Sequence, residues 1–273
     1  MARNVEMIER IEKAPVDYPL EFALIGDTGA SPNPVGDLIF RELLSQLGSV
    51  LFFANLGDFS GPGTQERHDH YLRLVGGLSV PNICILGNHD MDDPTGWNNF
   101  ERIHGPVNFQ FAVGNSLFIA INCQWHTDGP RDIDLLYLER CLSENDRPVT
   151  VVFMHMPPNF GGRFAPHEEW GFSNRESEFL EIITKHNVSL VCCAHVLCYD
   201  FHLFEGIPFV TTGGGGWGIC THMGETCTSS QAPDRGVFYH YAKVSIDAAG
   251  GISGGIVRSA EGENTDSAFD WKM

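Results

Sequence analysis

Phe22-Ala23-Leu24-Ile25-Gly26-Asp27-Thr28-Gly29 places an unbroken apolar run directly before a short polar cluster. An apolar run of this length is typical of a strand that is buried on both faces of a parallel sheet. Such a strand delivers the residues that follow it to the carboxyl edge of the sheet, where open α/β folds bind their ligands. Asp27 is therefore the first candidate for a functional group at that edge.

The same arrangement recurs further along the chain. Apolar runs lead into four more polar clusters, which are Leu56-Gly57-Asp58, Leu86-Gly87-Asn88-His89-Asp90, Phe153-Met154-His155 and Cys193-Ala194-His195. Their carboxylate, amide and imidazole groups are donors that suit Mn, Zn, Fe or Mg. We therefore expect a metal site whose ligands are Asp27, Asp58, Asn88, His155 and His195. Taken singly, Asp27 or Asn88 could cap a turn, and each histidine could be a hydrogen-bonded core residue. The occurrence of all five clusters in this order favours a metal site over these separate explanations.

This order of motifs resembles the calcineurin-like metallophosphoesterase family. The family pattern is Asp-x-His, Gly-Asp, Gly-Asn-His-Asp or Glu, a lone His, and Gly-His-x-His, and the resemblance runs from Asp27 to His195. It implies an α/β fold, a four-layer sandwich of two mixed β-sheets flanked by helices. It also implies an enzyme that hydrolyses phosphate monoesters or diesters with hydroxide held between two metal ions.

The resemblance divides the candidate ligands between two metal sites. Asp58 would bridge both ions, and one site would be completed by Asn88, His155 and His195. All the ligands of that site are present. The resemblance thus implies one well-ligated site for a divalent ion such as Mn, Fe, Zn or Mg.

The other site is depleted. It keeps Asp27, but Gly29 and Leu197 stand where the family has imidazoles. Purple acid phosphatases, more distantly similar, also have Gly at the position of Gly29 and compensate with a Tyr at the position of Gly61. A tyrosinate–iron centre is therefore not supported. The depleted site could bind a metal weakly, use water and another ligand, or be empty.

His89 is not a ligand in the family scheme. It would contact the phosphate or protonate the leaving group, a task suited to a group that titrates near neutrality. Asp90 follows directly and could orient that imidazole. The lost ligand positions leave one alternative to an enzyme open, which is a degenerate single-metal family member that acts as a binding or regulatory protein.

The loop at 156–173 follows His155 directly and is long for a simple connector. Within it, Arg163 could pair with a substrate phosphate and His167 could supply a proton donor near the site. The alternative is a surface loop that is packed down by Trp170.

Composition favours a single enzyme domain over residues 1–273. The formal net charge of −18 makes nucleic acid an unfavourable partner, and no apolar stretch approaches the length of a membrane span. The resemblance implies a small phosphorylated substrate, and the oligomeric state stays open. Residues 1–18 and the acidic tail at 260–273 are expected to be loosely ordered.

The chain has 8 cysteines and no paired Cys-x-x-Cys pattern of a zinc module. Several lie within apolar runs, where a reduced thiol behaves as a small hydrophobe. The reducing cytoplasm is the expected compartment. Cys220 and Cys227 flank His222, so a disulfide or an additional metal there stays open.

The remaining periodicity predicts alternating strands and helices. Strands are predicted at 22–25, 50–55, 82–86, 107–113, 117–122, 149–154, 190–193, 201–204, 209–211, 237–246 and 252–257. Helical faces are predicted within 38–47, 71–78, 135–142 and 179–183.

Overall fold

The computed structural model describes residues 2–29, 31–123, 133–164, 170–219, 236–259 and 270–273. It contains the helices α1 (Arg3–Lys13), α2 (Pro34–Ser45), α3 (Gln65–Val75), α4 (Gly96–Ile103), α5 (Leu135–Ser143) and α6 (Glu176–Lys185), and the 3₁₀ turn η1 (His89–Met91). Its strands are β1 (Leu20–Ile25), β2 (Phe52–Asn55), β3 (Asn82–Cys84), β4 (Phe109–Val113), β5 (Ser116–Ala120), β6 (Val149–Phe153), β7 (Leu190–Cys193), β8 (Tyr199–Phe204), β9 (Ile207–Thr212), β10 (His240–Ile246), β11 (Ile252–Arg258) and β12 (Trp271–Lys272).

These strands form two six-stranded sheets. The first has the order β12-β11-β10-β1-β2-β3 and the second β4-β5-β6-β7-β9-β8. In the first sheet, β1, β2 and β3 are parallel, and β10 is antiparallel to β1. In the second sheet, β5, β6, β7 and β9 are parallel. Both sheets are therefore mixed, and each has a block of parallel strands whose carboxyl ends share one edge.

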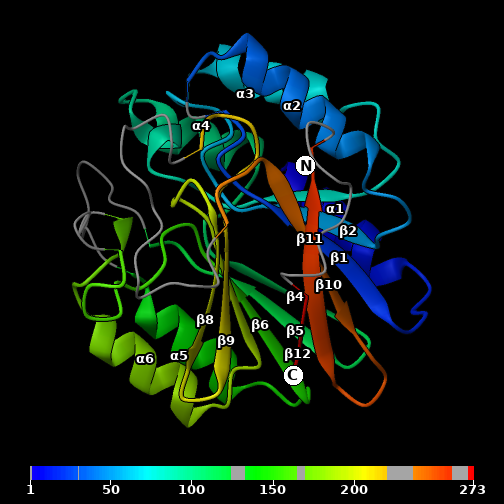
Figure 1. Cartoon of the computed structure of the whole chain (residues 1–273), viewed down its shortest axis with the longest axis vertical. Coiled ribbons are helices and arrows are strands. Elements are labelled where there is room, and N and C mark those ends of the chain that lie inside the picture. The colour runs from blue at the N-terminus through cyan, green and yellow to red at the C-terminus, as the bar shows by residue number, and fades with distance from the viewer. Residues whose placement is uncertain (1, 30, 124–132, 165–169, 220–235, 260–269) are drawn as a thin grey trace.

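The sheets pack face to face and carry helices on their outer faces. Between them, Phe22 of β1 stacks on Phe52 of β2 at 5.2 Å and meets Phe118 of β5 edge-on at 5.4 Å. The next residue of each run points the other way, so Ala23 and Phe53 pack beneath α2, α3 and α4. The helices α5 and α6 cover the second sheet (Figure 1). The predicted four-layer α/β sandwich is confirmed.

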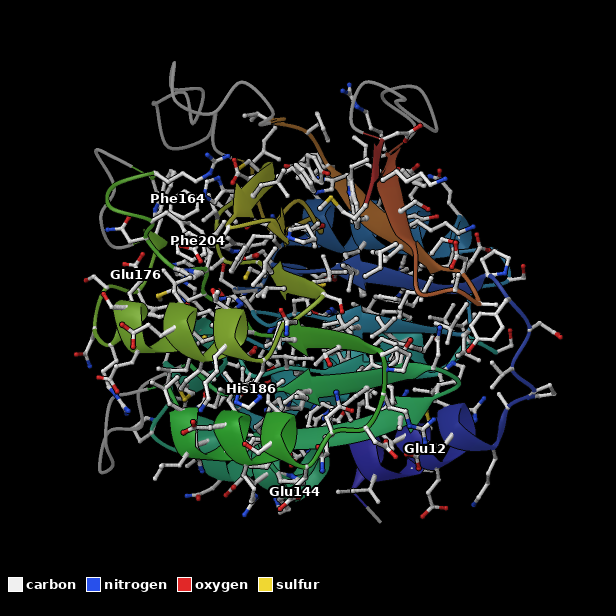
Figure 2. The ribbon with its side chains drawn as sticks, turned by 90° about the horizontal axis from the view of Figure 1, so that it is seen from below. Glu12, Glu144, Phe164, Glu176, His186 and Phe204 are labelled. Carbon is white, nitrogen blue, oxygen red and sulfur yellow. The ribbon has the colours of Figure 1, made fainter. Side chains whose placement is uncertain are left out.

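The prediction that residues 1–18 are loosely ordered is wrong for the part that forms α1. Met7 and Ile11 are buried, because their spacing of four residues puts them on one face of the helix. The Asn4 side chain donates to the carbonyl of Cys84 at 2.9 Å and accepts from its amide at 3.0 Å. Glu12 accepts from the amide of Ala112 on β4, and Figure 2 shows Glu12 on α1 beside the green strands.

The C-terminal tail is also more ordered than predicted. Trp271 and Lys272 form β12 and pair with β11, and the Trp271 ring stacks on Phe201 at 5.4 Å. Residues 260–269, where most of the acidic tail lies, fall outside the described residues. Among the described residues, no helix is both long and apolar enough to cross a membrane.

Candidate metal centre

The candidate ligands meet where the parallel strands of both sheets end. Ile25 of β1 is in register with Asn55 of β2, so the loops with Asp27 and Asp58 leave the first sheet at the same level. In the second sheet, β6 and β7 are in register at Phe153 and Cys192. His155 and His195 each follow their strand by two residues. Both contact loops of the first sheet, His155 at the carbonyl of Leu56 and His195 at the carboxylate of Asp27.

His155 lies at the centre of the group. Its Nε2 atom is 3.1 Å from Oδ1 of Asn88, 3.2 Å from Nδ1 of His195 and 3.4 Å from Oδ2 of Asp58. The ligand atoms of Asp58, His155 and His195 all lie within 4.8 Å of one another. Ligands about 2.1 Å from a common cation are about 3.0–3.4 Å apart in octahedral or tetrahedral geometry. The separations around His155 therefore fit a metal ion.

The tautomer of His155 also suits a metal ligand. Its Nδ1 atom is 2.7 Å from the carbonyl oxygen of Leu56, which can only accept a hydrogen bond. The Nδ1 atom must therefore carry the proton, and in the neutral ring Nε2 has a free lone pair that points into the group. A hydrogen bond to the far ring nitrogen is the usual support of a metal-binding histidine.

Two glycines let these groups approach one another. A Cβ atom at Gly57 would collide with the imidazole of His155, and one at Gly87 would collide with the carboxylate of Asp58. Gly57 also has a φ of 107°, which side chains rarely allow. The glycines of the Gly-Asp and Gly-Asn-His-Asp motifs are thus required by close packing around the ligands.

Asp27, Asp58 and His195 have left-handed backbones, with φ of 57°, 56° and 67°. Non-glycine residues rarely adopt this conformation, and when they do they concentrate at functional sites. The turns direct the side chains back toward each other, and the His195 amide donates to Oδ2 of Asp27 at 2.8 Å. The Asp58 carboxylate is held at its other oxygen by the amide of His89, at 2.9 Å.

The buried charges favour a cation. Burial raises the pKa of Asp27 well above its usual value, although the His155 charge opposes the rise. Burial alone would also raise the pKa of Asp58, but His155 outweighs it and the pKa is lowered. Burial lowers the pKa of His155, yet the Asp58 carboxylate prevails and raises it to about 9. The negative field that holds a proton on His155 would equally attract a metal ion, which would compete with that proton.

Two features oppose a matching second site. A Cβ atom at Gly29 would lie 2.8 Å from the carbonyl oxygen of Phe59, so a histidine there would require the backbone to move. Leu197 is buried in an apolar cluster with Phe164 and Trp170. Among the described residues, the candidate ligands that remain at this position are therefore Asp27 and the shared Asp58.

The structure corrects the role expected for Asp90. The carboxylate next to His89 is that of Asp92, whose Oδ2 lies 2.7 Å from Nδ1 of the imidazole. Asp90 is fully buried. It accepts from the amides of Asp58, Phe59, Ser60 and Gly87 and from the Ser60 hydroxyl. Asp90 therefore holds the loop of the Asp58 ligand and does not orient His89.

The expected phosphate contact of Arg163 is also corrected. Its guanidinium forms a bidentate ion pair with Asp200 on β8, at 2.8 and 3.0 Å, and donates to the carbonyl of Phe201. The Arg163 side chain is only 11% exposed. Arg163 thus anchors the loop after His155 to the second sheet. His167 lies outside the described residues.

The family profile of the calcineurin-like phosphoesterases matches residues 20–199. The chain belongs to the calcineurin-like phosphoesterase family. The match runs from β1 through β7 and so covers the strands that carry the candidate ligands. Members of this family depend on a binuclear metal centre. No curated protein sequence matches the chain.

Two solved structures share the fold of this chain. A purple acid phosphatase from yellow lupin seeds superposes with a TM-score of 0.66 at 13% identity, over 92% of this chain and 53% of the lupin chain. This chain thus spans about half the length of the lupin enzyme. GAP50, the anchor in the inner membrane complex of Plasmodium, superposes with a TM-score of 0.66 at 16% identity, over 93% of this chain and 88% of its own.

Sequence reasoning missed two residues beside His89. One is Asp92, which contacts the imidazole. The other is Trp217, whose ring centroid lies 5.5 Å from that of His89. The short spacing from His89 to Asp92 could have suggested the first contact, because residues three apart in a helical turn face the same side. No local signal marks Trp217, which is 128 positions away in the sequence.

Proposed function

We propose that this calcineurin-like phosphoesterase hydrolyses phosphate esters of small molecules and uses a metal-activated water. The observation that carries the proposal is the convergence of Asp58, Asn88 and His195 on Nε2 of His155, at separations that fit a cation. These four residues would hold one divalent ion, with Asp27 left to support a weaker second one. A bound ion would neutralise phosphate charge and lower the pKa of a water molecule.

Among the described residues, His89 is well placed to move a proton. Its side chain is 36% exposed, and its amide is fixed by Asp58 at the edge of the centre. Because Asp92 accepts from Nδ1, the Nε2 atom is the one left to face a substrate. An imidazolium held in this way can donate its Nε2 proton to the ester oxygen as the P–O bond breaks.

The test is hydrolysis of an aryl phosphate monoester and an aryl phosphate diester by the Mn-loaded protein. Replacing His89 by Ala should lower the rate by about 10²–10⁴-fold, the usual contribution of a positioned acid. The metal content should not change. His186→Ala is the matched control, because this imidazole follows α6 on the far side of the second sheet (Figure 2). Equal rates for parent and His89→Ala would remove the proposed acid.

A second candidate function is binding or regulation by a single-metal protein. It is favoured by the packing at Gly29 and Leu197, which leaves the second ion without two imidazoles. The fold neighbour GAP50 is described as an anchor. Tight binding of one ion without hydrolysis of either ester, at any Mn concentration, would support this candidate over the first.

We also propose a reducing compartment such as the cytoplasm. Buried, reduced thiols support it; among the described residues, Cys84, Cys141, Cys192 and Cys193 are of this kind. Cys220 and Cys227 lie outside the described residues.

A further inference from the structure

Trp217 forms one side of the site next to the proposed acid. Its ring plane is tilted by 42° from the His89 ring, with the centroids 5.5 Å apart. In the proposed reaction, His89 protonates the oxygen of the leaving alcohol. A group that is attached to that oxygen and extends past His89 would therefore contact the Trp217 ring.

Trp217 is held rigidly although its ring is only half-buried. Its amide donates to the carbonyl of Asp27 at 2.9 Å, and its own carbonyl accepts from the Asn33 side chain at 3.0 Å. The indole Nε1 donates to the hydroxyl of Ser31 at 2.8 Å. The polar atoms of Trp217 are thus satisfied by the loop that carries the Asp27 ligand. A ring fixed in this way can receive a partner on its face without further loss of side-chain entropy.

The support behind Trp217 is apolar. The ring packs against a cluster that consists of Phe164, Trp170, Val196, Leu197 and Cys198. Leu197 stands at the position where the family pattern has a metal-binding histidine. The loss of that ligand therefore extends an apolar wall up to the edge of the centre.

From this arrangement, and resting on the proposed hydrolysis, we propose that the alcohol part of the substrate carries an aromatic ring that stacks on Trp217. The shared chemistry is a flat π system attached to the phosphate through the ester oxygen. It is found in phenolic and benzylic esters and in nucleotides. Stacking of a base on an aromatic side chain contributes about 1–3 kcal/mol, which is about a 5- to 150-fold change in affinity.

The experiment measures binding, not turnover. The Mn-loaded protein is titrated by calorimetry with methylphosphonate, benzylphosphonate and a nucleoside phosphonate, all of which carry P–C bonds that the enzyme cannot hydrolyse. The parent should bind at least one of the aromatic phosphonates about 5- to 150-fold more tightly than methylphosphonate. The aromatic probe that binds more tightly shows whether the ring belongs to a phenolic or benzylic ester or to a nucleotide.

Three variants separate stacking from packing. Trp217→Ala should lose the preference for aromatic probes while its methylphosphonate affinity and metal content stay at the parent level. Trp217→Phe should keep most of the preference because it retains a flat ring. Trp217→Leu retains apolar volume without a ring and should lose most of the preference for aromatic probes. If the Ala variant does not fold, the comparison of Phe with Leu decides the question.

The outcomes distinguish this inference from the proposed function. If no phosphonate binds, the proposed phosphoesterase function fails. If methylphosphonate binds but the aromatic probes are no tighter in the parent, the stacking inference is overturned and the proposed function survives. The inference is also overturned if Trp217→Ala or Trp217→Leu retains the full preference for aromatic probes.

Discussion

Replacing Asp90 by Asn should destabilise the fold while leaving the chemistry at His89 in place. Oδ1 of Asp90 accepts from the amides of Phe59 and Ser60 and from the Ser60 hydroxyl. Oδ2 accepts from the amides of Asp58 and Gly87. An asparagine keeps one oxygen, which can accept from one pair of these amides. Its NH₂ group then faces the other pair.

The magnitude follows from this count. In either orientation of the amide, two buried backbone N–H groups lose their acceptor and face another donor. Each buried donor without a partner costs about 1–3 kcal/mol. The Asp90→Asn variant should therefore lose about 2–6 kcal/mol of unfolding free energy. Urea unfolding, followed by circular dichroism at pH 7.5 in the parent and the variant, measures this directly.

Asp92→Asn is the matched control. The Asp92 side chain is exposed and contacts the His89 imidazole, so its replacement should change the unfolding free energy by less than about 0.5 kcal/mol. It should instead lower the rate, because the imidazole loses the carboxylate that orients it. An Asp90→Asn protein within 1 kcal/mol of the parent would refute the reasoning. So would an Asp92→Asn variant that loses more stability than Asp90→Asn.

Three further predictions concern the metals and the buried histidines. His155→Ala should weaken Mn binding by more than about 100-fold in equilibrium dialysis, beyond the 10–100-fold loss typical of replacing a residue that only supports a metal ligand, while His186→Ala should bind as the parent does. Leu197→His should raise the metal-to-protein ratio from about one toward two in excess Mn, measured by elemental analysis. Gly29→His should not, because its Cβ would lie 2.8 Å from the Phe59 oxygen, and Leu203→His on β8 is the exposed control; two tightly held ions in the parent would contradict this view. Lowering the pH from 7 to 5 should reduce the unfolding free energy by about 2 kcal/mol through His68 alone. Burial lowers the pKa of His68 to about 4, so between these pH values the unfolded chain binds a proton that the folded state excludes. His68→Gln should show a smaller fall in urea unfolding, and an identical fall would contradict the assignment.

Much of the fold and the candidate ligand set could be predicted because their signals are local. An apolar run that ends in Gly-Asp or Gly-Asn-His-Asp predicts both a buried strand and the polar residues at its carboxyl end. The strand predicted at 190–193 was correct to the residue, and that at 50–55 differed by two. Strand order then brings together ligands as distant in sequence as Asp58 and His195.

The contacts that were missed depend on where loops lie in space. Arg163 pairs with Asp200, 37 residues away, and no pattern within the loop indicates that partner. Asp90 looked suited to orient His89 because the two are adjacent. The turn in which they lie points their side chains in different directions, toward the amides in one case and toward solvent in the other. The error came from treating neighbours in sequence as neighbours in space.

The helix α1 was missed for a different reason. Its charged residues predicted a solvated segment, and its apolar face is narrow, with Met7 and Ile11 buried. Isolated helices of this length are marginal in water. Its stability comes from contacts with the two sheets, which sequence periodicity does not report.

The position of α1 bears on how the molecule stays separate from its copies. β3 and β4 each end their sheet, and an uncovered end strand is a template for pairing with another chain. The Asn4 amide satisfies both the N–H and the C=O of Cys84, as a neighbouring strand would. Glu12 accepts a hydrogen bond from the amide of Ala112 and so places a carboxylate beside β4. One short helix therefore covers the β3 end of the first sheet and the β4 end of the second, and opposes β-pairing with another chain at these two strands.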